Sequence, residues 1–90
     1  MSKFSEKQGQ YLAFIYTYEL LNDRPPAEAD MQAFFRVTPP TVHNMIIELE
    51  GRGLITRTPR VARSIRLAVT QEELPQLRRP QPIRSPVGDY

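Results

Sequence analysis

The segment from residue 38 to residue 53 carries the start and stop signals of a single amphipathic helix. Thr38 is suited to cap the first turn, and Pro39 fits the first helical position because no backbone amide hydrogen is needed there. Apolar residues then recur at helical spacing at Val42, Met45, Ile46 and Leu49. Gly51 and Gly53 follow them and signal the end of the helix. The pattern predicts a helix with one buried stripe, which turns outward the side chains of Thr41, His43, Asn44, Ile47 and Glu48.

Two runs of strand-forming residues follow this helix, at 54–58 and 64–69. Apolar residues alternate along the second run and share one face: Ile65, Leu67 and Val69. Residues 59–63, with the sequence Pro-Arg-Val-Ala-Arg, connect the two runs. The sequence therefore predicts a β-hairpin with an arginine-bearing tip.

Two further helices are predicted before this segment. Ser5 followed by Gln8 forms a capping-box pattern at the start of the first helix. Its apolar residues recur with helical spacing at Leu12, Ile15, Tyr16 and Leu20, and the stripe is broadened by Tyr11, Phe14, Tyr18 and Leu21. This surplus aromatic surface suits either the core or a partner interface, and the small size of the domain favours the core.

Prolines at positions 25 and 26 break the first helix. A second helix of about nine residues is predicted from near Ala27, with Met31, Phe34 and Phe35 buried. Three helices followed by a hairpin predict a mainly α fold with a small β-hairpin, the three-helix winged helix-turn-helix. We assign residues 1–70 to this domain and expect residues 71–90, a Pro/Arg-rich tail, to be extended or disordered.

Chain length and residue types exclude several classes of function. Ninety residues allow one modest core, which is too little for the deep cleft of an ordinary enzyme. The chain has no cysteine and one histidine, so we expect no metal site, no cofactor and no catalysis. Glu48 and Glu50 are not a catalytic pair, because two residues apart on a helix they point to different sides. The sequence has neither a long apolar run nor an apolar leader, which predicts a cytoplasmic protein without membrane contact.

Basic residues are concentrated in the second part of the chain. Residues 1–56 have a net charge of −2, whereas residues 57–90 have a net charge of +4. Between residues 51 and 68 there is no acidic residue, and the basic residues are all arginine: Arg52, Arg57, Arg60, Arg63 and Arg66. Arginine suits bidentate contacts with phosphate or guanine, although it is also common on exposed strands. We favour a nucleic-acid partner over a merely solvated face.

In combination, these segments resemble the amino-terminal DNA-binding domain of LexA-type repressors. The resemblance spans Ser5 to Val69. It rests on Ser-x-x-Gln at 5–8, Arg-Pro-Pro at 24–26, Thr-Pro at 38–39, the run from Leu49 to Ile55, and Ser-Ile-Arg-Leu at 64–67. It implies a homodimer on a two-fold operator, with the hairpin tip on the DNA backbone and base edges contacted by Thr38, Pro40, Thr41, His43 and Asn44.

The sequence departs from this family in three respects. Two acidic residues common in the family's recognition helix align with His43 and Asn44, and its usual asparagine aligns with Pro40, so the operator sequence does not transfer. Ala27 stands where the family favours a hydroxyl cap, and this loss costs on the order of 1 kcal/mol of helix stability. The residues after the hairpin leave no room for the family's carboxy-terminal Ser-Lys domain, so self-cleavage is not expected.

Double-stranded DNA is therefore the expected partner. Asn44 is suited to paired hydrogen bonds with adenine, and Thr41 to a thymine methyl group or a phosphate. His43 suits a guanine or phosphate contact and plain solvent exposure equally well. The hairpin tip supplies candidate phosphate contacts, with Arg60 foremost: Arg57, Arg60 and Arg63. We expect a sequence-specific DNA-binding protein that acts as a transcriptional repressor.

A winged-helix protein-interaction module is the alternative, because fold alone does not decide function. A continuous basic surface over the third helix and the hairpin favours DNA, whereas Glu48 and Glu50 beside an apolar patch favour a protein partner. Arg78, Arg79 and Arg84 in the tail suit non-specific attraction to DNA and simple solubility equally.

Overall fold

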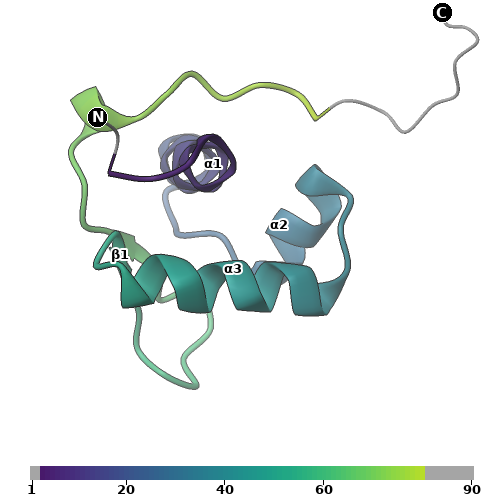
Figure 1. Ribbon diagram of the computed structural model, residues 1–90. Coiled ribbons are helices and arrows are strands. Elements are labelled where there is room, and N and C mark those ends of the chain that lie inside the picture. Colours follow the sequence, from purple (N-terminus) through teal and green to yellow (C-terminus); the bar gives the residue numbers. More distant parts are fainter. Residues whose placement is uncertain (1–2, 81–90) are drawn as a thin grey trace, which may run out of the picture.

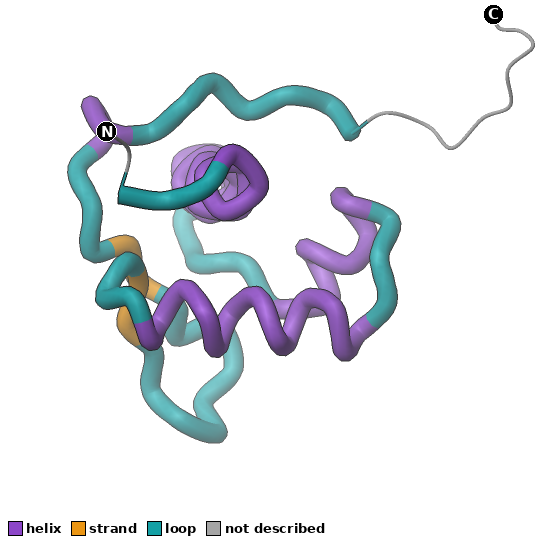
Figure 2. The backbone as a smooth tube through the Cα atoms, in the orientation of Figure 1, coloured by secondary structure: helices purple, strands orange, loops and turns teal. Residues whose placement is uncertain are grey.

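A computed structural model describes residues 3–80. Three helices are followed by a two-stranded sheet and a short 3-10 turn, in the order α1 (Glu6–Asn22), α2 (Glu28–Phe35), α3 (Pro39–Gly51), β1 (Ile55–Thr56), β2 (Arg66–Leu67) and η1 (Gln71–Glu73). Figure 1 shows α1 nearly end-on above α3, with α2 beside both. The loop between β1 and β2 extends past α3 on the side away from α1, as the tube in Figure 2 also shows. This arrangement confirms the predicted winged helix-turn-helix.

Local capping signals set the start of α1, as the sequence predicts. The backbone amide of Gln8 donates to the Ser5 hydroxyl over 3.1 Å, and the Ser5 amide donates to the Gln8 side-chain oxygen over 2.9 Å. The two bonds satisfy amide groups that a helix start leaves without partners. At the other end Asp23 adopts a left-handed conformation with φ 58°, and its amide bonds to the carbonyl of Glu19.

The second helix begins without a side-chain cap at Ala27, but another group compensates in part. The carboxylate of Asp30 accepts a hydrogen bond of 2.8 Å from the Ala27 amide. The helix spans 8 residues and ends at Arg36, whose φ of 57° turns the chain toward α3. Thus the carboxylate from the first helical turn supplies half of a capping box where the hydroxyl is missing.

The third helix has the predicted bounds, with Thr38 at the capping position and Pro39 first in the helix. The Thr38 hydroxyl makes no cap bond, however, because it lies 3.0 Å from the Thr41 hydroxyl instead. Val42, Ile46 and Leu49 are buried, which confirms the apolar stripe.

The hairpin is shorter than predicted. Ile55 pairs with Leu67 and Thr56 with Arg66, and regular pairing stops there, whereas the sequence predicts strands over 54–58 and 64–69. A proline at position 59 cannot donate to a strand ladder, and side-chain hydrogen bonds replace the ladder beyond Thr56. The alternation is confirmed, with Ile65 buried and the residues at 67 and 69 partly buried.

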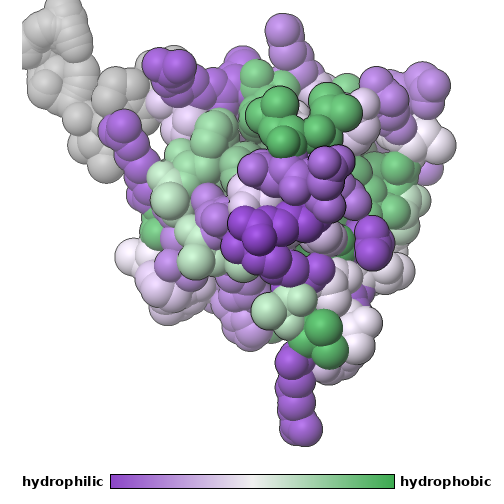
Figure 3. All heavy atoms as spheres, turned by 180° about the vertical axis from the view of Figure 1, so that it is seen from behind, coloured by the Kyte–Doolittle hydropathy of each residue, from purple (hydrophilic) through white to green (hydrophobic). Residues whose placement is uncertain are grey.

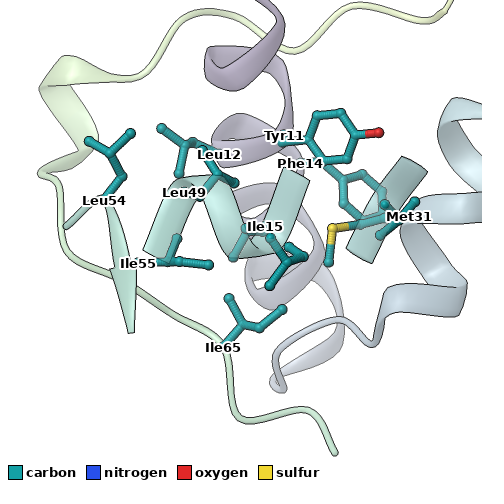
Figure 4. Packing of buried hydrophobic residues seen from close by; sticks show 11 residues of the cluster. Tyr11, Leu12, Phe14, Ile15, Met31, Leu49, Leu54, Ile55 and Ile65 are labelled. Atoms are coloured by element: carbon teal, nitrogen blue, oxygen red, sulfur yellow. The ribbon is translucent and has the colours of Figure 1, made fainter. Parts of the chain in front are cut away.

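The core lies where α1 crosses α3 and meets the hairpin, as the labelled side chains of Figure 4 show. Its buried members come from all three helices and the hairpin: Tyr11, Leu12, Phe14, Ile15, Met31, Val42, Ile46, Leu49, Leu54, Ile55 and Ile65. The Tyr11 ring stacks on Phe35 with centroids 4.1 Å apart, and Phe14 lies 4.8 Å from Phe34. The additional aromatic side chains of α1 therefore belong to the core, as expected for a domain this small.

The core differs from the prediction in two places. In α2, Phe34 and Phe35 pack against the core but are only partly buried. The second difference is in α1. Leu20 continues the helical spacing of Leu12 and Ile15, yet its side chain is 65% exposed, and Leu21 is also exposed. All the buried residues of α1 lie between Gln8 and Ile15. The apolar helical spacing therefore continues to Leu20, although the buried part of α1 ends at Ile15.

Residues 71–80, which we call the strap, pass across α1 (Figure 1). Leu74 and Leu77 pack against the core, and the strap after η1 is neither helix nor strand. A Cβ atom on Gly9 of α1 would lie 3.0 Å from the Pro75 ring, so the small residue permits this close approach. Packing against the core thus extends to Leu77 in the strap, and Arg84 lies outside the described residues. Within residues 3–80, no helix has the length and apolar character needed to cross a membrane.

Candidate nucleic-acid interface

The outer face of α3 is open to solvent. Its exposed side chains are Pro40, Thr41, His43, Asn44, Ile47 and Glu48, and Thr38 is exposed just before the helix. Val42, Ile46 and Leu49 anchor the opposite side of the helix in the core. The prediction of which side of α3 faces the core and which faces solvent is therefore confirmed. Within residues 3–80, no other segment covers the expected contact face.

One edge of this face lies beside the loop between β1 and β2. The Nδ1 atom of His43 is 3.4 Å from the carboxylate of Glu28, at the start of α2. Glu28 also lines a hollow of about 290 Å³ together with Arg57, Arg60 and other residues of the loop. The wing loop, which we define as residues 57–65, is thus adjacent to the His43 edge of α3.

Arg60 lies at the tip of the wing loop. The Val61 amide donates to the Thr58 carbonyl over 3.1 Å, with Pro59 and Arg60 between them. Arg60 has φ 66°, which with proline before it is the arrangement of a type II turn, where glycine is the usual residue. Its side chain is exposed and has no hydrogen bond or ion pair to residues 3–80. Figure 3 shows the molecule from behind, with hydrophilic atoms projecting at the wing end.

A serine hydroxyl closes the neck of the wing loop. Ser64 Oγ accepts a hydrogen bond of 3.0 Å from the Thr58 amide. The same oxygen lies 3.0 Å from the Thr58 carbonyl and 2.8 Å from the Val61 carbonyl, to either of which its single hydrogen can be donated. The sequence places Ser64 at the start of a predicted strand, and no local pattern indicates this bridge.

Replacing Ser64 with alanine is expected to loosen the wing loop. The loss of these hydrogen bonds should lower the free energy of unfolding by about 1 kcal/mol, measured by urea denaturation. Amide hydrogen exchange at Thr58 should accelerate, because its acceptor is removed. Ser64→Thr keeps the hydroxyl and serves as the control; equal exchange rates in the two variants would contradict the bridging role.

Arg63 is held by its own chain. Its Nη1 atom lies 3.2 Å from the Tyr18 hydroxyl, 3.2 Å from the Pro25 carbonyl and 3.0 Å from the Asp30 carboxylate. The hydrogen bond to Tyr18, together with the nearby Asp30 carboxylate, raises the pKa of the Arg63 guanidinium above its ordinary value. These contacts connect the wing loop to α1, to the α1–α2 loop and to α2.

The expected phosphate contacts of the wing loop therefore differ in their surroundings. Arg63 faces inward, and Arg57 donates to the Glu50 carboxylate over 3.0 Å. Arg60 alone among these three extends without a partner in the described part of the chain. Sequence reasoning missed Tyr18 and Asp30 as supports of the wing, because they are 45 and 33 residues from Arg63.

The outer face of α3 is largely neutral rather than basic. Glu50 is paired with Arg57, whereas Glu48 is exposed, and the adjacent Ile47 is 47% exposed. Positive charge at this surface comes from its flanks, not from α3. In residues 3–80 no three His, Cys, Asp or Glu side chains gather in a way that could hold a metal ion.

Sequence comparison finds relatives of this chain among the LexA repressors. The chain is 40% identical over 74 residues to the LexA repressor of Thermosipho melanesiensis, an alignment that covers 82% of this chain and 37% of that repressor. It is 32% identical over 87 residues to the LexA repressor of Thermosipho africanus, which covers 97% of this chain and 39% of the repressor. The chain thus spans less than two fifths of the length of these relatives. No protein-family model matches it. The chain thus has the winged helix-turn-helix fold and LexA repressors as relatives over most of its own length, which is consistent with an amino-terminal domain of the LexA type.

Proposed function

We propose that this chain binds double-stranded DNA sequence-specifically and acts in transcriptional repression in the cytoplasm. The observation that carries the proposal is the position of the wing loop, which extends beyond α3 on the side away from α1 and next to the open face of that helix (Figure 1). A helix in the major groove and a loop over the adjacent backbone require this arrangement. Similarity to two LexA repressors supports the same function.

The outer face of α3 supplies the base contacts in this proposal. Asn44 offers a donor and an acceptor to adenine, and Thr41 offers a methyl group and a hydroxyl. Thr38, Pro40 and His43 complete the contact face at the start of the helix. His43 approaches DNA from the wing side, where Glu28 orients its ring.

The wing loop supplies phosphate contacts, and its arginines take different roles. Arg60 binds phosphate, because its guanidinium is exposed at the turn. Arg63 holds the loop against α1 and α2 through Tyr18 and Asp30. Arg57 contributes charge close to Glu50, so its attraction to phosphate is weaker than that of Arg60.

Replacing Arg60 with glycine is expected to weaken binding to every duplex alike. One lost phosphate contact flattens the plot of log K against log salt by about one unit. Glycine accepts the φ of 66° without the strain of a side chain, so thermal stability should not fall. Arg60→Lys keeps the charge and is the control; a loss of affinity restricted to one sequence would contradict the phosphate role.

Selection from a random duplex library at two salt concentrations tests the function. A DNA-binding domain of this kind should enrich one motif at both concentrations. Single modules bury only about 600–1,000 Å² of protein surface on DNA, so we expect two copies and a motif with two-fold symmetry. An asymmetric motif bound by a monomer would contradict the expected homodimer. The absence of any enriched motif would contradict the proposed function.

A protein-interaction module is the second candidate. The half-exposed Ile47 beside Glu48 on the outer face of α3 favours it, because an apolar side chain next to an acid does not attract phosphate. Saturable binding of a polypeptide to the outer face of α3, together with no enriched duplex in the selection, would establish that function in place of DNA binding.

A further inference from the structure

A hollow of about 510 Å³ lies beside α3 at the edge away from the wing loop. Thr41 lines it, whereas His43, two residues on, faces Glu28 and the wing side. Two residues correspond to about 200° around a helix, so these side chains mark opposite edges of α3. The aromatic rings of Tyr11 and Phe35 also line the hollow.

Basic residues from distant parts of the sequence meet at this hollow. Lys7 comes from the first turns of α1, and Arg78 and Arg79 come from the strap. The one acidic lining residue, Glu6, is paired with Arg78 over 2.6 Å. Lys7 and Arg79 are exposed and have no ion pair within residues 3–80, so the hollow presents two uncompensated positive charges beside Thr41.

The strap is fixed in one register by the side chain of Gln10. Its amide nitrogen donates to the Gln76 carbonyl over 3.0 Å, and its oxygen accepts from the Arg78 amide over 2.8 Å. A second tether joins Lys3 to Glu73 over 2.8 Å, and this hydrogen bond lowers the pKa of the Glu73 carboxyl. Because both ends of the Gln10 amide bind strap backbone, the residue after Arg78 is held at the rim of the hollow.

We propose that the strap is a second phosphate clamp, in which Arg79 and Lys7 contact the DNA strand that borders the Thr41 edge of α3. A helix in the major groove lies between two phosphate backbones, about 12 Å apart across the groove. The wing loop covers the strand on the His43 edge, and the strap covers the other. This inference rests on the proposed DNA binding and adds a contact surface, formed by the strap and the start of α1, to those of α3 and the wing loop.

The test compares single-arginine variants of the full chain on the duplex found by selection. Arg79→Ala should flatten the salt dependence by about one unit, so that the gain in affinity on lowering salt from about 200 to about 50 mM falls roughly 3-fold. Arg66→Ala is the charge-matched control, since Arg66 pairs with Glu19 of α1. Equal slopes for the two variants would show a mere net-charge effect and overturn the clamp.

A second variant separates position from charge. Gln10→Ala removes both hydrogen bonds to the strap and no charge. Phosphate-ethylation interference at the phosphate that Arg79 contacts, on the strand at the Thr41 edge, should be lost in this variant and in Arg79→Ala, and should persist in Arg66→Ala. Persistence of that interference in Gln10→Ala would overturn the clamp. If the unsubstituted chain binds no duplex, the proposed function itself fails; if it binds and Arg79→Ala changes nothing, only the strap inference fails.

Discussion

Replacing Leu12 with alanine is expected to remove about 2–5 kcal/mol from the free energy of unfolding. The Leu12 side chain is fully buried among α1, α3 and the hairpin, and truncation leaves a cavity that the surrounding side chains fill only in part. A domain of this size has a total stability of roughly 5–13 kcal/mol, so the loss is a large fraction of it. Urea denaturation followed by circular dichroism measures the change.

Leu20→Ala is the matched control in the same helix. The substitution removes the same atoms, and leucine and alanine are both good helix formers, but Leu20 is 65% exposed. Its stability should therefore change by no more than about 0.5 kcal/mol. A cost for Leu20→Ala equal to that of Leu12→Ala would mean that the last turns of α1 are packed in solution, contrary to the structure.

Asn44→Ala is expected to have the largest effect on DNA recognition. Loss of a paired contact with a base costs about 1–3 kcal/mol of discrimination, which corresponds to roughly 5- to 150-fold weaker binding to the selected duplex. Binding to unrelated duplexes should change little, and the salt slope should stay the same, because no charge is removed. Competition titrations with specific and unrelated duplexes measure both quantities.

The control for Asn44→Ala is Arg60→Gly, for which the opposite signature is expected. Asn44 is exposed, so its truncation should leave the unfolding midpoint nearly unchanged. Weaker binding with an unchanged midpoint then indicates a lost contact rather than a folding defect. Equal weakening on all duplexes would assign Asn44 to the backbone. Unchanged affinity for the selected duplex would remove Asn44 from the contact face.

The helix boundaries were predictable because their signals are local. Ser5 and Gln8 form both bonds of their capping box, and Pro39 begins α3 as the sequence indicates. The apolar spacing of Val42 and Leu49 likewise placed the inward side of α3. Where another nearby partner competed, the local prediction was incomplete, since the Thr38 hydroxyl meets Thr41 rather than a backbone amide.

Strand length was less predictable than helix length. The residues after Thr56 have strand-forming side chains, but the Ser64 hydroxyl and the turn at Arg60 replace the backbone ladder there. Strand propensity reports how a side chain fits a half-buried sheet, and it does not specify which backbone groups pair.

The sequence by itself determined where each helix starts and ends, which face of α3 is exposed, and that a hairpin follows. Only the tertiary structure decided that Arg63 turns inward to Asp30, that Leu20 stays exposed, and that Gln10 holds the strap against α1. The physical reason is separation along the chain. Capping and helical spacing act over three or four residues, whereas the contact of Arg63 with Asp30 and that of Gln10 with the strap join groups 33 and 68 residues apart, which only the packed core brings together.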